Sequence, residues 1–259
     1  MSGTTVDLVE AVRQLGKQLG FWNHGFAYQH GCKRLFGDAD FEDKSMLEIG
    51  CGKGIYCLWA KIHGAKHVVG LEPLAEGSLD SRKCYRDFDA IVKALNLENI
   101  EMLPLKIQDY KSPEGYFDVV LSVASVNHLD ERNCIELRRS AEARNAYLAI
   151  FKELRRTMKD DGTVIIVDAS SRNVFGDFGM KNPFQPDIEW FKHQTPEYWA
   201  ELLSECGFTN PRISWLPGLW SRHLGIYTTS KAVAYFGSSL FRLEMRCAKA
   251  EPVASVSRA

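Results

Sequence analysis

The sequence predicts an α/β fold built on a doubly wound, mostly parallel sheet of seven strands, with an N-terminal helical cover and lid insertions. From residue 45 onward, short apolar runs alternate with stretches of helical periodicity, a pattern typical of buried parallel strands joined by helices. The chain has 259 residues, of which 45% are hydrophobic, so it is long enough for one such domain with a full core. We expect its crossovers to be right-handed.

Seven segments are predicted to form the sheet. The five buried parallel strands are expected to be the short apolar runs that end at Ile49, Leu71, Leu105, Val123 and Val167. Two final strands are expected over residues 212–215 and 240–247, the second with alternating apolar and polar side chains. The predicted helices of the sheet domain lie at 55–62, 75–95, 134–158 and 196–206, with a turn at 160–162 before the fifth strand.

Three regions are expected along the chain. Residues 1–43 are predicted to form a helical cover, because apolar side chains recur there at helical spacing between positions 6 and 15. The sheet domain is expected over residues 44–250, with lid segments near 169–194 and 217–239, and a disordered tail over 251–259.

The first predicted strand runs directly into a glycine-rich turn. Glu48 lies two residues before Gly50, and Gly52 and Gly54 follow at every second position, with Cys51 between the first two glycines. Glycines here allow a tight turn and a close backbone approach to a ligand at the carboxyl edge of the sheet. A dinucleotide-binding fingerprint would carry its third glycine one residue later. The pattern resembles motif I of the class I S-adenosylmethionine-dependent methyltransferases, Asp/Glu-x-Gly-x-Gly-x-Gly, whose fold is Rossmann-like with seven strands.

This resemblance implies that S-adenosyl-L-methionine is the cofactor, that the glycine loop meets its methionine moiety and that Glu48 orders the turn. Glu72, followed by Pro73, ends the second predicted strand, twenty-two positions after the first glycine of the loop. The family places an acid there that accepts both ribose hydroxyls. Ser122 and Val123 end the fourth predicted strand, where the resemblance places the methionine end of the cofactor.

The segment after the third predicted strand departs from the family pattern. The family usually carries an acid near the position of Lys106, followed by a residue whose backbone contacts the adenine. We therefore assign the adenine edge to the Ile107 backbone and the Gln108 side chain, with Asp109 as the substitute acid.

Two histidines are candidates for the base that removes a proton from the methyl acceptor. A neutral histidine suits this task at neutral pH. His128, just past the fourth predicted strand, is the first candidate, and the alternative is a cap or a cofactor contact. His193, in the segment after the fifth strand, is the second, and the alternative is a structural histidine.

Four further residues are predicted to meet the substrate. Tyr28 comes from the N-terminal cover, and Glu189 and Trp190 from the segment after the fifth strand. Asp168 ends that strand and could orient either the substrate or a histidine. We predict no metal, because no cysteine or histidine pair has ligand spacing and the pair Asp168 and Asn173 is poorly spaced for one.

The composition narrows the expected partners. A formal net charge of −1 and a pI near 6.7 give no overall attraction to a phosphate backbone, so we expect a small-molecule acceptor and no nucleic acid. With no apolar run of about 18 to 20 residues, no membrane contact is expected. Seven scattered cysteines indicate a reduced, cytoplasmic protein. We expect a monomer or a homodimer.

The predicted function is O-methylation of a small molecule in natural product biosynthesis, with N-methylation as the next possibility. A methyltransferase of RNA or protein is an alternative, and it predicts a basic groove near the sheet edge. A cofactor-binding regulator without activity is an alternative of another class. A nicotinamide-dependent dehydrogenase shares the fold class, but the early third glycine argues against it.

Overall fold

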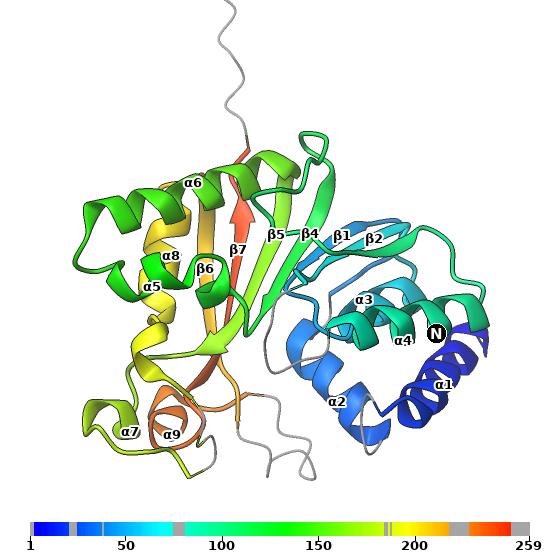
Figure 1. The fold of residues 1–259 in the computed structure, drawn as a ribbon, viewed down its shortest axis with the longest axis horizontal. Coiled ribbons are helices and arrows are strands. Elements are labelled where there is room, and N and C mark those ends of the chain that lie inside the picture. Colours follow the sequence, from blue (N-terminus) through cyan, green and yellow to red (C-terminus); the bar gives the residue numbers. More distant parts are fainter. Residues whose placement is uncertain are drawn as a thin grey trace, which may run out of the picture.

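A single sheet of seven strands organises the described part of the chain (Figure 1). The computed structural model describes residues 3–20, 25–37, 39–74, 81–183, 186, 188–217 and 228–249. The strand order is β3-β2-β1-β4-β5-β7-β6; β1 to β5 run parallel, and β7 runs antiparallel to both β5 and β6. The strands are β1 Ser45–Ile49, β2 His67–Leu71, β3 Ile100–Leu103, β4 Phe117–Val123, β5 Met158–Ala169, β6 Phe208–Trp215 and β7 Leu240–Cys247. The predicted doubly wound, mostly parallel sheet is therefore confirmed.

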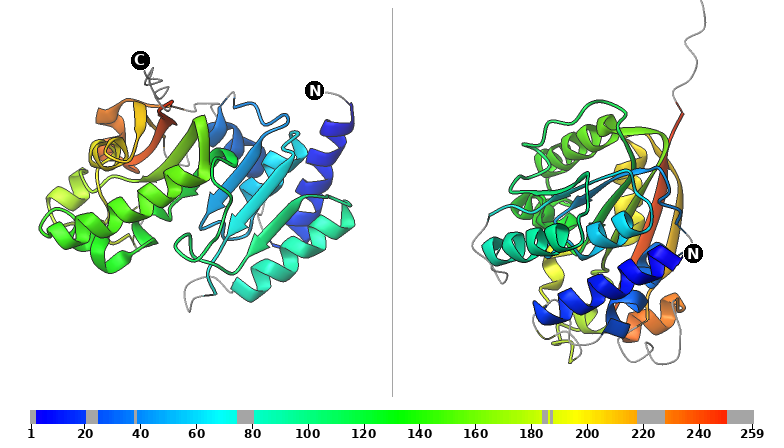
Figure 2. Two further views of the ribbon diagram at one scale, coloured as in Figure 1. Left: turned by 90° about the horizontal axis from the view of Figure 1, so that it is seen from above. Right: turned by 90° about the vertical axis from the view of Figure 1, so that its right-hand side faces the viewer.

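Helices cover both faces of the sheet (Figures 1 and 2). The helices of the first face are α1 Gly3–Gln18, α2 Gly25–Phe36, α3 Ile55–Ile62 and α4 Ser81–Ala94. The helices of the second face are α5 Glu131–Glu136, α6 Ala141–Thr157 and α8 Pro196–Ser204. Two short helices, α7 Val174–Asp177 and α9 Lys231–Phe236, lie together at the carboxyl end of β5. The 3-10 turns are η1 Val126–His128 and η2 Trp190–Lys192.

Alternation along the strands divides the core into two layers. In β5, Ile165 and Val167 belong to the apolar cluster of the first face, whereas Val164 and Ile166 belong to that of the second. Successive strand side chains point to opposite faces, so a strand covered on both faces is apolar at consecutive positions. This explains why these strands appear in the sequence as continuous apolar runs.

The long helix predicted over residues 134–158 is wrong, because the structure divides it into α5 and α6. Ser140 is the N-cap of α6, and its hydroxyl accepts a hydrogen bond from the Ala143 amide. A serine hydroxyl satisfies an amide that the first helical turn leaves without a partner, so the second helix begins there. Apolar periodicity continues across this break and conceals it in the sequence.

Four predicted strand boundaries also change, among them the end of β5, which lies at Ala169, two residues after the predicted Val167. β3 ends at Leu103, two residues before the predicted end, whereas β6 begins at Phe208, four residues before the predicted start. The turn predicted at residues 160–162 lies inside β5. A shift in the pairing of β4 with β5 and a positive φ of 61° at Asp161 mark the irregularity there. The aspartate–glycine signal therefore indicates a bulge within a strand and not its beginning.

The N-terminal cover packs on the helices of the first face, with α1 against α3 and α4 and α2 against α3. The division into cover, sheet domain and lids stays a prediction, and the predicted disordered tail lies outside the described residues. Among the helices that the structure describes, none is both long enough and apolar enough to cross a membrane.

Candidate active site

The glycine loop after β1 combines a left-handed backbone with close packing, so that Gly50 and Gly54 have no room for a side chain. Gly50, Gly52 and Gly54 have φ values of 69°, 54° and 69°, in the left-handed region that glycine adopts at low cost. A Cβ added to Gly50 would lie 2.4 Å from the Ser125 Cβ, and one added to Gly54 would lie 2.5 Å from the Phe88 ring. Both glycines are therefore required by the turn and by its neighbours.

A pair of serines ties the end of β4 to the end of β1. The Ser125 hydroxyl donates to the Ile49 carbonyl oxygen at 2.6 Å, and its oxygen lies 2.7 Å from that of Ser122. Ala124 between them has a positive φ of 50°, which is uncommon for a residue with a side chain. The predicted contact residues Ser122 and Val123 therefore end a strand held directly beside the glycine loop.

Glu72 faces the glycine loop from the end of β2. The Gly52 amide donates to Glu72 Oε2 at 2.7 Å, and the Tyr85 hydroxyl donates to the Glu72 carbonyl oxygen. The Glu72 side chain is half-buried, and this burial raises the pKa of its carboxyl. A carboxylate beside a loop of bare backbone fits the ribose hydroxyls of S-adenosyl-L-methionine. Pro73 follows it and is partly exposed.

Glu48 lies behind the loop and not at its surface. The residue is 1% exposed, and the Cys57 thiol donates to its Oε2 at 3.0 Å. Burial raises the pKa of Glu48 to about 8, so the carboxyl is mostly protonated at neutral pH. Cys51 is also buried, and its sulfur would lie 2.7 Å from a Cβ at Gly70. The buried position of Glu48 behind the loop fits the prediction that this residue orders the turn.

The residues assigned to the adenine edge follow β3. Ile107 is buried, whereas the Gln108 side chain is exposed and donates from Nε2 to the Leu129 carbonyl oxygen at 2.7 Å. This hydrogen bond ties the segment after β3 to the segment after β4. Asp109, the proposed substitute acid, is exposed. Their contacts with adenine stay predictions.

Asp168 and His193 meet at the carboxyl end of β5, although 25 residues separate them in the sequence. His193 Nδ1 lies 3.2 Å from Asp168 Oδ1; the carboxylate side chain is 1% exposed and the imidazole 11%. The Trp190 ring lies 6.3 Å from the His193 ring. A buried carboxylate that binds Nδ1 fixes the tautomer and leaves Nε2 as the proton acceptor. The arrangement can therefore serve as a general base.

His128 has a more open setting. Its side chain is 53% exposed, and its Nδ1 lies 2.9 Å from Glu131 Oε2. Lys192 joins Glu131 to Glu189, with nitrogen–oxygen distances of 2.7 and 2.6 Å. The hydrogen bonds from Lys192 and His128 lower the pKa of Glu131. Glu189, a predicted substrate residue, is thus part of a surface ion-pair network with the His128 region.

One polar side chain near this edge, that of Asn127, was absent from the sequence-based predictions, whereas Trp190 was among the predicted substrate residues. Asn127 is 1% exposed, and its Oδ1 has no hydrogen-bond partner among the described residues; the same holds for the indole nitrogen of Trp190. Asn127 belongs to η1, four residues after the end of β4 and next to His128. The available signal in the sequence was an amide side chain soon after an apolar strand. Its unpaired oxygen is notable because buried amides seldom lack hydrogen-bond partners.

A cavity of about 730 Å³ adjoins the end of β5, where Ser170 and Ser171 follow the strand. Its volume lies within the range of about 300 to 1,000 Å³ that is typical of small-molecule sites. The other lining residues are Arg138, Arg172, Thr195, Glu197, Trp215, Lys231 and Tyr235.

The remaining predictions concern Tyr28 and metal ions. Tyr28 belongs to α2, but its side chain lies outside the described part of the structure. No group of three or more histidine, cysteine, aspartate or glutamate side chains with the geometry of a metal site occurs among the described residues.

A family model and several curated relatives match parts of this chain. A family described as a methyltransferase domain matches residues 21–212. A tRNA U34 carboxymethyltransferase of Actinobacillus succinogenes is 32% identical over 109 residues, which are 41% of this chain and 30% of the relative. The match thus spans less than a third of that relative's length.

Solved structures share the fold. The structure from Thermotoga maritima described as a possible histamine N-methyltransferase has a TM-score of 0.56 at 16% identity and covers 93% of this chain and all of its own. The geranyl diphosphate C-methyltransferase of Streptomyces coelicolor, solved with S-adenosyl-L-homocysteine, has a TM-score of 0.56 at 13% identity. That match covers 86% of this chain and 79% of the other.

The exclusion of nucleic acid is corrected by these comparisons, because curated relatives are named as tRNA enzymes. The net charge of −1 is a sum over the whole surface and does not report where basic side chains gather. A local basic surface is therefore compatible with a balanced composition.

The glycine loop after β1, the acid at the end of β2 and the seven-stranded sheet agree with the family match, which covers well over half of the chain. The cofactor is S-adenosyl-L-methionine, and the chain belongs to the methyltransferase-domain family, as a class I S-adenosylmethionine-dependent methyltransferase.

Proposed function

We propose that this enzyme methylates a hydroxyl group and that His193, positioned by Asp168, removes the proton of that hydroxyl. The observation that carries the proposal is the contact of 3.2 Å between His193 Nδ1 and the buried Asp168 carboxylate. A histidine held by a carboxylate is a recurrent general base. An amine acceptor is second, since it needs a base only when it is protonated.

The proposed division of labour follows from the placement of the side chains. When bound, S-adenosyl-L-methionine supplies a methyl group on a positively charged sulfur. Glu72 and the glycine loop would hold it at the ends of β1 and β2. His193 would accept the proton at Nε2 while Asp168 stabilises the resulting positive charge. His128 is the second candidate base, but its exposure of 53% makes it less suited to a site that must exclude water.

We further propose that the acceptor hydroxyl belongs to RNA. The relatives from Actinobacillus succinogenes and Aeromonas hydrophila, both named tRNA U34 carboxymethyltransferases, support this substrate class. A small-molecule acceptor is the second candidate. A cavity of about 730 Å³ lies beside Ser170, two residues after Asp168, and its volume suits a compact ligand.

The test combines transfer of a radioactive methyl group with two histidine variants. The chain is incubated with S-adenosyl-L-methionine labelled on the methyl group, together with either total unmodified tRNA or a protein-free extract of small metabolites. Label in tRNA supports the RNA acceptor, and label confined to the small molecules contradicts it.

The role of His193 is tested on whichever acceptor is labelled. His193→Gln is expected to lower kcat about 100- to 10,000-fold with unchanged cofactor affinity by isothermal titration calorimetry, and His128→Gln serves as the matched control. Asp168→Asn should also lower kcat and alter its pH profile, because the asparagine favours the wrong tautomer. A larger loss of kcat for His128→Gln than for His193→Gln would contradict the assignment.

A further inference from the structure

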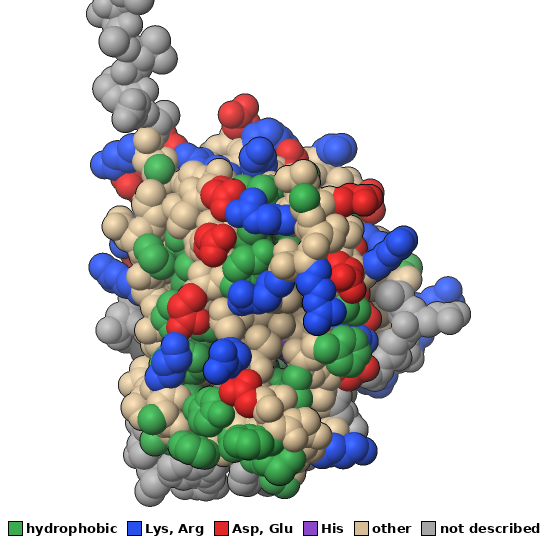
Figure 3. Space-filling view, turned by 90° about the vertical axis from the view of Figure 1, so that its left-hand side faces the viewer, with side chains coloured by type: hydrophobic (Ala, Val, Ile, Leu, Met, Phe, Trp, Pro, Cys, Tyr) green, Lys and Arg blue, Asp and Glu red, His purple; other side chains and the backbone are tan. Residues whose placement is uncertain are grey.

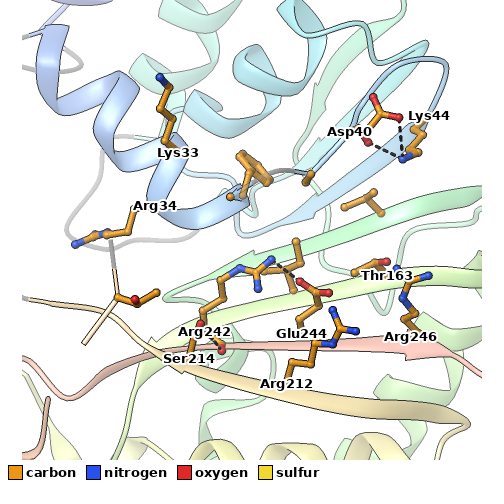
Figure 4. A pocket seen from close by; sticks show the side chains of 16 residues that line it. Lys33, Arg34, Asp40, Lys44, Thr163, Arg212, Ser214, Arg242, Glu244 and Arg246 are labelled. Atoms are coloured by element: carbon orange, nitrogen blue, oxygen red, sulfur yellow. Dashed lines mark hydrogen bonds and ion pairs between the residues drawn. The ribbon is translucent and has the colours of Figure 1, made fainter. Parts of the chain in front are cut away.

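A basic groove of about 860 Å³ runs across the first face of the sheet, beside α2 (Figure 4). It is bounded by the first face of β5, β7 and β6 on one side and by α2 with the segment before β1 on the other. Six basic side chains line this basic groove: Lys33, Arg34, Lys44, Arg212, Arg242 and Arg246.

The groove exists because the helices of the first face do not extend over the last two strands. Among the described residues, the main helix contacts of β6 and β7 come from α8, which lies on the second face. In β7, Leu243 and Met245 point into the core of the second face. The alternate residues Arg242, Glu244 and Arg246 therefore point to the first face, where they line the groove.

Positive charge is concentrated there. The lining contains six basic side chains and two acidic ones, Asp40 and Glu244, hence a formal charge of +4. Because the whole chain carries −1, the rest of the chain carries −5. By contrast, basic and acidic side chains are interspersed on the side of the molecule that Figure 3 shows.

Part of this charge is not neutralised within the protein. Arg242 is held in place, since it donates to the Leu35 carbonyl oxygen and to Glu244, both at 2.6 Å. The exposed side chains of Lys33, Arg212 and Arg246 make no hydrogen bond or ion pair with any described residue. These three cations remain available to an external anion.

We propose that the basic groove binds the phosphodiester backbone of RNA. This inference rests on the RNA acceptor proposed for the enzyme. Arg242 and Arg246 are four residues apart on one strand, hence about 13 Å, so the cations form a row and not a single anion site. The hydroxyls of Thr163 and Ser214 lie along the same row, and hydroxyl and guanidinium groups are common phosphate donors.

The groove is suited to the backbone and not to the bases. Phe36, the aromatic side chain of the described lining, is 3% exposed, so it offers no surface on which a base could stack. Contacts limited to phosphates carry no sequence information. The groove would therefore supply affinity, and selection of the methylated nucleotide would be left to the site around Asp168 and His193.

The experiment measures RNA binding directly. Binding of a fluorescently labelled, single-stranded RNA of 20 nucleotides is followed by anisotropy at several salt concentrations. With three to six cations engaged, the slope of log K against log salt concentration is expected between about −2 and −4. The double variant Arg212→Glu/Arg246→Glu should weaken binding at least 10-fold and flatten the slope. The matched control, Arg139→Glu/Lys152→Glu, changes the charge equally on exposed residues outside the groove and should stay within 2-fold of wild type.

Each outcome decides the proposal. Calorimetry with S-adenosyl-L-methionine verifies that both double variants are folded. Anisotropy measures RNA binding and not methyl transfer, so a failed groove and a failed base are distinguishable. Equal RNA affinity of the groove variant and wild type would overturn the proposal, as would a folded wild-type chain that binds no RNA. Poly-L-glutamate that competes as well as RNA at equal charge would reassign the groove to acidic proteins.

Discussion

Replacing Glu48 by glutamine is expected to change how the stability of the enzyme depends on pH. Glu48 is 1% exposed and receives a hydrogen bond from the Cys57 thiol. Burial, the main cause, raises the pKa of its carboxyl from 4.5 to about 8. The folded state therefore holds a proton at Glu48 under conditions in which the unfolded chain has released it.

The sign and the size of the effect follow from this difference. Because the folded-state pKa is raised, the stabilising contribution is fully present below pH 4.5 and is lost as the pH rises through about 8. One pKa unit corresponds to about 1.4 kcal/mol, so the full difference is on the order of 4 to 5 kcal/mol. Between pH 5.5 and 7.5, wild type should lose about 2 to 3 kcal/mol through this group.

Urea unfolding of wild type and Glu48→Gln at pH 5.5, 6.5 and 7.5 measures the effect. Glutamine has nearly the same shape but no proton to lose, and all other titrating groups cancel in the difference between the two proteins. The free energy of unfolding of the variant minus that of wild type should therefore rise by about 2 to 3 kcal/mol between pH 5.5 and 7.5. Glu142, an exposed residue of α6, provides the control Glu142→Gln, whose difference should stay constant. A constant difference for Glu48→Gln as well would refute a buried, protonated carboxyl behind the glycine loop.

Two further predictions concern the cofactor edge. Glu72→Gln should weaken S-adenosyl-L-methionine binding about 10- to 100-fold in calorimetry, because a charge-assisted hydrogen bond contributes about 1.5 to 3 kcal/mol; unchanged affinity would exclude Glu72 from the ribose site. Gly50→Ala should destabilise the fold by at least about 1 kcal/mol through its φ of 69°, and more through the overlap with Ser125. In urea unfolding of the double variant, Ser125→Gly should recover the stability lost through the overlap but not the stability lost through the φ angle. If the free-energy changes of the two single substitutions simply add up in the double variant, the overlap is contradicted.

The sheet and the cofactor loop were predictable because their signals are local. Strands buried on both faces appear as short apolar runs, and β1, β2, β4 and β7 end at the predicted residues. The glycine spacing is equally local, since three left-handed residues within one turn need three glycines. Errors arose where apolar periodicity continued through a cap, as at Ser140.

The acceptor end of the site depends on contacts that no local pattern encodes. The sequence offered His128 and His193 as candidate bases and Asp168 as a residue that could orient either substrate or a histidine. Only the tertiary placement of the segment around η2, which contacts α5, brings His193 to Asp168, and His128 is left largely exposed. A buried carboxylate determines the tautomer and orientation of the histidine it contacts, and this contact joins residues 25 positions apart.

Charge shows the same division between sequence and tertiary structure. Composition determines the formal charge of −1, and the alternation in β7 determines that Arg242, Glu244 and Arg246 share one face. Neither determines that this face lies beyond the helices of the first layer, beside Lys33 and with Arg212 on the neighbouring strand. Net charge is a sum, whereas the field that an anion meets depends on which charges the fold places side by side. The sequence by itself therefore determined the fold class and the cofactor, and only the tertiary structure decided which side chains can act together.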